Sequence, residues 1–130
     1  MNAFLNSGFF FVATSLVVLV AIFVFDKLIK YKVWEEINNG NMAVALAVGG
    51  VVVGVANIMR CAISANDSVL RTIIWGGFGT TLLLIVYFAF ELFTPKLNVT
   101  DEIAKGNKAV GWISFIFSLA FSFIIGASIS

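Results

Sequence analysis

Four long stretches without a charged residue dominate the sequence. They cover Met1–Phe25, Asn41–Met59, Thr72–Phe90 and Ala109–Ser130. Each reaches the roughly 18 residues at which an apolar stretch becomes a candidate membrane-spanning helix. Hydrophobic residues make up 61% of the chain and charged residues 12%, against about 45–50% and 25% in soluble proteins. We therefore predict an all-α integral membrane protein with four spanning helices, over about residues 8–29, 41–64, 70–93 and 108–129.

A segment in the first half of the chain returns in the second half. Val33–Ala43 reads VWEEINNGNMA, and Val99–Ala109, which lies 66 positions later, reads VTDEIAKGNKA. A period of half the chain predicts two copies of one structural unit. We place these two-helix units at residues 1–65 and 66–130 of a single membrane domain.

The basic residues predict an orientation in the membrane. Six lysines flank the two longer connections, and only Arg60 and Arg71 flank the opposite side. Positively charged loops remain preferentially in the cytoplasm. We therefore expect a multi-pass plasma (inner) membrane protein with cytoplasmic acidic loops and both termini outside. Because a unit of two helices returns to its starting side, the two copies are expected to be parallel rather than inverted.

Each copy of the repeated loop predicts a short helix at the membrane surface. We expect its acids to point to water, and Trp34, Ile37 and Ile103 to point towards the headgroups. Glycine suits the left-handed position that ends a helix, and asparagine suits the N-cap of the next one. Asn98 also stands at a capping distance before Asp101. The recurring loop residues are Glu35, Glu36, Gly40, Asn41, Asp101, Glu102, Gly106 and Asn107.

Two spans carry a stripe of small residues on one helical face. The second span has Ala47, Gly50 and Gly54, continued by Asn57, and the fourth has a ladder of serines at steps of four. Small residues let helix backbones approach closely in lipid. Two uses remain open, packing inside one bundle or an interface between copies. The serines of the ladder are Ser114, Ser118 and Ser122.

Three of the charged residues that border the apolar stretches are candidate functional residues. Asp26 and Glu91 occupy nearly equivalent positions in the two units, and a carboxylate at the edge of the hydrocarbon is costly unless it is paired or hydrated. They are either interfacial anchors, each with a lysine partner from the other unit, or part of a cation or proton site. Arg60 lies one turn inside the opposite surface, where it can snorkel to a lipid headgroup or pair with Asp67.

The composition argues against several kinds of function. The chain has no histidine and one cysteine, Cys61, so we expect no metal, no cofactor and no catalytic residue. The formal net charge of +1 gives no reason to expect a nucleic-acid partner. We therefore expect that the protein is not an enzyme.

The paired loops, EEIxxGNxA and DEIxxGNxA, each between two apolar helices, resemble a small bacterial membrane protein family catalogued as domain of unknown function 350. The resemblance spans essentially the whole chain, from Phe25 onwards. It implies a bacterial plasma-membrane protein, and by analogy a membrane-organising role with membrane-stress or scaffold proteins as partners. The second copy departs from the first by having Thr100 and Lys108 in place of Trp34 and Met42, which argues against equal roles for the two loops.

Two functional hypotheses follow. The first is a non-enzymatic integral membrane protein that forms homo-oligomers and organises membrane lipid or partner proteins. The second is an oligomeric small-cation or proton channel or carrier that uses Asp26 and Glu91, with the serine ladder along its path. Tight packing of the serine ladder would favour the first hypothesis, and a hydrated cavity would favour the second.

Overall fold

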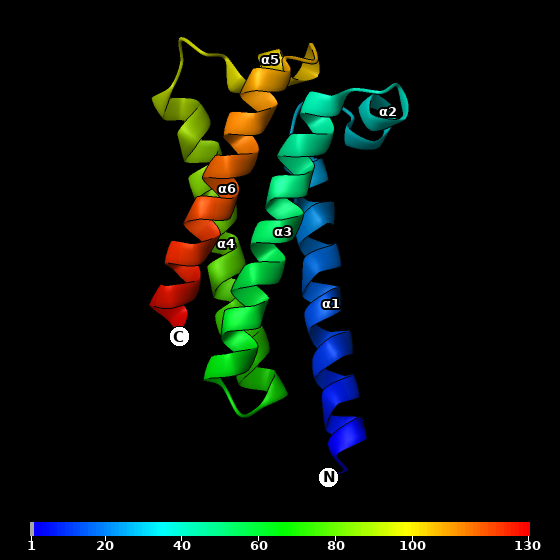
Figure 1. Ribbon diagram of the computed structural model, residues 1–130, viewed down its shortest axis with the longest axis vertical. Helices are drawn as coiled ribbons and strands as arrows, with labels where there is room; N and C mark the ends of the chain where they lie inside the picture. The colour runs from blue at the N-terminus through cyan, green and yellow to red at the C-terminus, as the bar shows by residue number, and fades with distance from the viewer. Residues whose placement is uncertain (1) are drawn as a thin grey trace.

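The computed structural model describes residues 2–130, and all regular structure in this range is helical. Four long helices lie side by side, and two short helices both lie at one end of them (Figure 1). All four long helices are long and apolar enough to cross a membrane, so the predicted all-α membrane class is confirmed. In chain order the helices are α1 (Ala3–Leu28), α2 (Val33–Asn38), α3 (Met42–Ala65), α4 (Val69–Phe93), α5 (Val99–Ala104) and α6 (Lys108–Ile129).

Three of the four predicted spans agree with α3, α4 and α6 to within one residue at each end. The exception is α1, which begins at Ala3 instead of near residue 8. The reason is local, because the side chain of Asn2 accepts a 2.7 Å hydrogen bond from the backbone N–H of Phe4 and caps the helix there.

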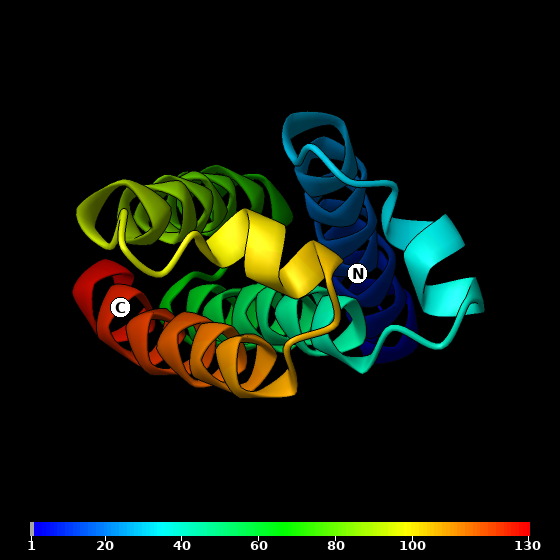
Figure 2. The same ribbon diagram turned by 90° about the horizontal axis from the view of Figure 1, so that it is seen from above.

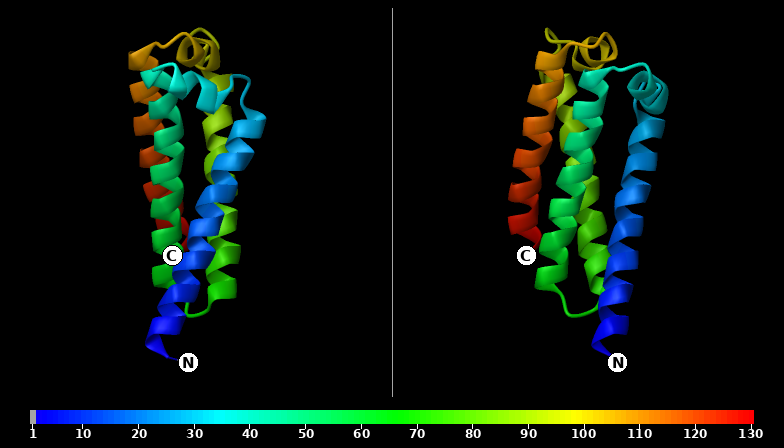
Figure 3. Two further views of the ribbon diagram at one scale, coloured as in Figure 1. Left: turned by 90° about the vertical axis from the view of Figure 1, so that its right-hand side faces the viewer. Right: turned by 45° about the vertical axis from the view of Figure 1, so that its right-hand side comes forward.

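The centre of the bundle is formed by α3 and α6, the second helices of the two sequence copies. They run in the same direction, since each leaves the end that carries the short helices (Figures 1 and 3). Buried apolar side chains of α3 include Val44, Val51, Val55 and Ile58. The helix contacts each of the other three long helices, so α3 is the axis around which the bundle is packed.

The two halves are not arranged identically around this centre. α4 packs against both α3 and α6, whereas α1 packs against α3 and α4 and makes no comparable contact with α6. The short helices differ in the same way. α5 contacts both α3 and α6, while α2 contacts α3 and projects to one side when the bundle is seen from this end (Figure 2). The first and short helices of the first sequence copy therefore pack against fewer neighbouring helices than those of the second copy do.

Candidate functional site

The two predicted small-residue stripes face each other inside one chain. A Cβ atom added to Gly50 would lie 2.8 Å from the Cα atom of Phe115, and one added to Gly54 would lie 3.4 Å from the Cβ atom of Ser122. Ala47, Ser114 and Ser118 are buried in the same region. The glycines therefore bring the backbone of α3 into contact with that of α6, where any larger side chain would collide.

A chain of hydrogen bonds leads from this interface to the surface. The Ser122 hydroxyl donates to the carbonyl oxygen of Leu119 at 2.6 Å, and it accepts a 3.0 Å hydrogen bond from the amide of Asn57. The Asn57 carbonyl oxygen in turn accepts from Nε and Nη2 of Arg60, at 3.2 and 3.0 Å. Asn57 therefore connects the serine ladder to Arg60, a link that its place on the α3 stripe did not reveal.

A cluster of buried hydroxyl groups lies towards the end of the bundle that carries the short helices. Tyr31 follows α1, and its hydroxyl lies next to that of Tyr87 in α4, which lies next to Ser114 in α6. Within residues 2–130, these three neighbouring hydroxyls form no well-formed hydrogen bond with one another or with another group, and neither does the hydroxyl of Ser118. Burial, the adjacent Tyr87 and the charge of Glu91 raise the pKa of Tyr31 above its ordinary value of 10.0.

Sequence reasoning missed both tyrosines. Neither belongs to a periodic stripe, and the one available signal was that Tyr87 places a hydroxyl group near the end of a largely apolar span. The ring of Tyr87 is held against Phe25 of α1, with ring centroids 5.1 Å apart. The cluster therefore exists because the ends of α1 and α4 pack together.

The structure does not provide the lysine partners that were predicted for Asp26 and Glu91. Both acids are half-buried, and neither takes part in the ion pairs or side-chain hydrogen bonds found in the described part of the chain. The ion pairs there, Lys32–Glu35 and Lys105–Glu102, each lie within one loop, because these lysines follow the helix ends and reach only their own short helix. Of the two acids, Glu91 is the one whose charge contributes to the raised pKa of Tyr31.

The repeated loops have the predicted backbone conformations. Gly40 and Gly106 have positive φ angles of 85° and 90°, and the N–H groups of Gly40 and Asn41 donate to the carbonyls of Ile37 and Glu36. The second loop repeats this pattern, which is the Schellman motif. Asn41 then caps α3, and Asn107 caps α6. Glycine and asparagine together thus end a surface helix and start a spanning one.

The two asparagines differ in what their side-chain amides contact. Nδ2 of Asn41 donates to the carbonyls of Ile103 and Ala104, both at 3.1 Å, so it holds the end of α5 in the other sequence copy. Nδ2 of Asn107 donates instead to the Glu102 carboxylate within its own loop, at 2.9 Å. The loops are therefore not equivalent.

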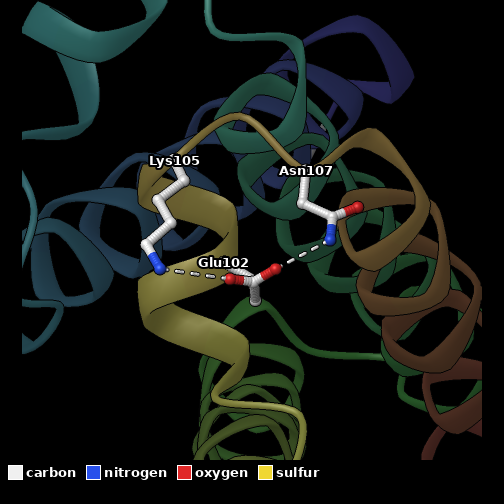
Figure 4. A network of polar contacts seen from close by, with 3 residues as sticks. All are labelled: Glu102, Lys105 and Asn107. Atoms are coloured by element: carbon white, nitrogen blue, oxygen red, sulfur yellow. Dashed lines mark hydrogen bonds and ion pairs between the residues drawn. The ribbon is translucent and has the colours of Figure 1, made fainter.

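Figure 4 shows Glu102 between Asn107 and Lys105. The Lys105 amine lies 3.5 Å from its carboxylate. The hydrogen bond from Asn107, together with the charge of Lys105, lowers the pKa of Glu102 below its ordinary value of 4.5. Glu35 and Asp101 remain exposed at the surface, and Glu36 is half-buried.

Two predictions about α5 are wrong. Asn98 does not cap it through its side chain, because its backbone is left-handed, with φ 48°, and no side-chain hydrogen bond forms. Ile103 does not face the headgroups but is fully buried, because α5 lies across the end of the bundle rather than beside it (Figure 2). Trp34 of α2, in contrast, is exposed.

Within residues 2–130, no group of three or more histidine, cysteine, aspartate or glutamate side chains is placed to hold a metal ion. The candidate sites described above are the central interface, the tyrosine cluster, the capped loops and the arginine network.

Comparison with known proteins places the chain among bacterial membrane proteins. It is 47% identical over 106 residues to the UPF0719 transmembrane protein YshE of Bacillus subtilis, covering 82% of this chain and 79% of that protein. It is 30% identical over 114 residues to the UPF0719 inner membrane protein YjfL of Escherichia coli K12, covering 88% and 84%. A UPF0719 transmembrane protein of Aquifex aeolicus is 32% identical over 110 residues, covering 82% of this chain and 41% of that protein.

No solved structure matches the chain. The sequence profile of the family described as Domain of Unknown Function (DUF350) matches residues 1–129. Together with the four apolar helices, this match shows that the chain is an integral membrane protein that belongs to the DUF350 family.

Proposed function

We propose that this protein is a non-enzymatic membrane component that self-assembles and organises membrane lipid or partner proteins. The packing of the serine ladder carries the proposal. Ser118 and Ser122 face Gly50 and Gly54 across a closely packed interface, so their hydroxyls line no wide hydrated path. A helix interface of this kind holds a bundle rigid, which suits a structural role better than transport.

The uneven packing of the two halves supports self-assembly. Ile58 and Ala62 of α3 are fully buried, where Gly79 and Gly76 of α4 pack against them. Their equivalents in the second copy, Ile124 and Ser128 of α6, are exposed. A second chain can cover this α6 face as α4 covers α3. Because both small-residue stripes are used inside one chain, the interface between copies would lie here instead.

The proposal also includes the orientation of the protein in the membrane and the proteins that its loops contact. The excess of lysines beside α2 and α5 favours placing both short helices in the cytoplasm. The acids of the repeated loops would then be presented to cytoplasmic proteins, including membrane-stress or scaffold proteins. The protein would act without a cofactor.

A second candidate function, a small-cation or proton channel or carrier, is favoured by one observation. The buried hydroxyls of Tyr31, Tyr87 and Ser114 lie next to one another without a well-formed hydrogen bond, and the charge of Glu91 contributes to the raised pKa of Tyr31. Unpaired polar groups in a membrane protein are costly and commonly mark a path for ions or protons. Asp26, the other acid assigned to this function, does not contribute to the raised pKa of Tyr31, and neither acid makes a hydrogen bond or an ion pair within the described chain.

Counting chains in a bilayer tests the proposal. The protein carries one fluorophore per chain and is reconstituted into liposomes at low density. Each fluorescent assembly is expected to photobleach in more than one step, because it contains more than one chain. Ile124→Trp is expected to lower the oligomeric fraction, whereas Leu19→Trp, on an exposed part of α1, is not. Single-step bleaching at every protein density would overturn self-assembly.

Flux through the same liposomes separates the two functions. Saturable or pH-dependent flux that disappears in Glu91→Gln, and persists in Glu36→Gln, would establish the channel or carrier instead. Flux no greater than that of empty liposomes is the outcome expected for a structural protein.

A further inference from the structure

A small groove lies between α1 and α3, towards the end of the bundle that carries the α3–α4 turn. It has a volume of about 380 Å³. Its walls are mainly apolar, with Phe11 and Val18 from α1 and Met59 and Ile63 from α3, and Arg60 lies at the same groove. A mainly apolar surface is therefore combined with one cationic group.

The guanidinium of Arg60 is oriented but not neutralised. Its Nε and Nη2 atoms both donate to the Asn57 carbonyl oxygen, which is neutral. No carboxylate in the described chain lies within ion-pair distance of it, including that of Asp67 in the adjacent turn. The Asn57 amide is itself fixed by Ser122. The positive charge is thus held in place at the groove, and Nη1 is left to bind an anion.

The position of Arg60 along α3 sets its depth in the membrane. It lies five residues before Ala65, the last residue of the helix, which corresponds to about 7.5 Å at 1.5 Å per residue. The whole helix is about 36 Å long by the same rise, against a hydrocarbon thickness of about 30 Å. The backbone of Arg60 therefore lies just inside the hydrocarbon edge. The hydrogen bonds to Asn57, one turn deeper on α3, hold the guanidinium at this depth instead of letting it extend outward.

We propose that this groove binds an anionic phospholipid, with its phosphate on the Arg60 guanidinium and one acyl chain along α1 and α3. The N–H groups of Nη1 are engaged by no side chain of the described residues, and they can donate charge-assisted hydrogen bonds to a phosphate oxygen. A charge at this depth needs a counter-ion, and headgroup phosphates are the nearest anions outside the protein. The site is independent of whether the protein self-assembles or transports an ion.

Native mass spectrometry of the intact chain with added phosphatidylglycerol or phosphatidylcholine tests the site. Phosphatidylglycerol is expected to bind more tightly, because it carries a net negative charge. Arg60→Gln is expected to weaken its binding by about tenfold or more, as loss of charge-assisted hydrogen bonds does. Arg71→Gln is the matched control, since Arg71 lies on α4 near the same membrane surface but does not line the groove.

A second variant tests the acyl-chain contact without touching the charge. Ala56 is exposed and lines the groove, while Val53 is exposed on the same helix and does not line it. Ala56→Leu is expected to weaken phosphatidylglycerol binding, and Val53→Leu is expected to leave it unchanged. This pair keeps the test valid if Arg60→Gln fails to fold.

Two outcomes would overturn the proposal. The first is equal binding of the two lipids that neither Arg60→Gln nor Ala56→Leu changes. The second is competition by millimolar inorganic phosphate with no effect of Ala56→Leu, because the site would then recognise a free anion and not a lipid.

Discussion

Gly49 and Gly50 are neighbours in α3, and a methyl group would have opposite effects at the two positions. A Cβ atom on Gly50 would lie 2.8 Å from the Phe115 Cα atom, which is backbone and cannot move aside. A Cβ atom on Gly49 would meet nothing within 4 Å. Close approach to α6, and not flexibility, is therefore what requires glycine at position 50.

We expect Gly50→Ala to lower the free energy of unfolding by about 1–3 kcal/mol, as overpacking of a rigid contact does. Gly49→Ala is expected to be neutral or to stabilise by up to about 1 kcal/mol, because alanine is the better helix former. Denaturation in mixed micelles measures both values. Equal effects of the two variants would contradict the close packing of α3 and α6.

The lowered pKa of Glu102 predicts a pH dependence of stability. A carboxyl whose pKa is lower in the folded state stabilises the fold above its unfolded pKa, here near 4.5. That contribution is lost as the pH falls through the lower folded pKa. We therefore expect Glu102→Gln to reduce the loss of thermal stability between neutral pH and pH 3.

Glu36→Gln is the matched control for this measurement. Glu36 holds the equivalent position in the first loop, and its side chain makes no ion pair or hydrogen bond within the described residues. If the two variants change the pH profile equally, Asn107 and Lys105 do not cause the effect.

At the scale of elements, α5 is held in place by the other sequence copy. The Asn41 amide donates to the carbonyls of Ile103 and Ala104, and the buried side chains of Val99 and Ile103 face the bundle. α2 has no such bond from Asn107, and it projects from the bundle (Figure 2). One side-chain amide therefore accounts for part of the difference between the two loops.

Asn41→Asp is expected to release the end of α5 while keeping the cap of α3, because a carboxylate still accepts hydrogen bonds but no longer donates them. Amide hydrogen exchange in residues 99–107 should quicken by about tenfold, given roughly 0.5–1.5 kcal/mol for each lost bond. Asn39→Asp makes the same change of charge at an exposed neighbouring position. Unchanged exchange in Asn41→Asp would show that burial alone holds α5.

At the scale of the whole molecule, four spans and parallel central helices place both short helices at one membrane surface. In a Cys61→Ala background, we expect Asn38→Cys and Asp101→Cys to react with an impermeant reagent from the same side. Asp67→Cys, in the α3–α4 turn, should react from the opposite side. In intact cells Asp67→Cys is the accessible position if the lysine-rich loops are cytoplasmic; the reverse pattern would overturn the proposed orientation.

The sequence by itself determined the number and extent of the spans, because an apolar segment must be long enough to cross the hydrocarbon and satisfy its own backbone. It also determined the loop backbone, since the conformations required at Gly40 and Gly106 are local. Local patterns gave the wrong prediction at two places. Asn98 adopts a left-handed backbone instead of capping α5, and Asn2 caps α1 several residues before its predicted start.

Only the tertiary structure decided which surfaces meet. In lipid every apolar face is equally well solvated. The periodicity of the sequence therefore identifies the face of α3 that carries Gly50 and the face of α6 that carries Ser118, but it does not show that these two faces pack against each other. The hydroxyl cluster around Tyr87, the hydrogen bonds from Asn41 to α5 and the hydrogen bond from Asn57 to Ser122 each join residues from different elements. Their contacts depend on how the helices pack, and this is set by close fit across the whole bundle rather than by any segment of sequence.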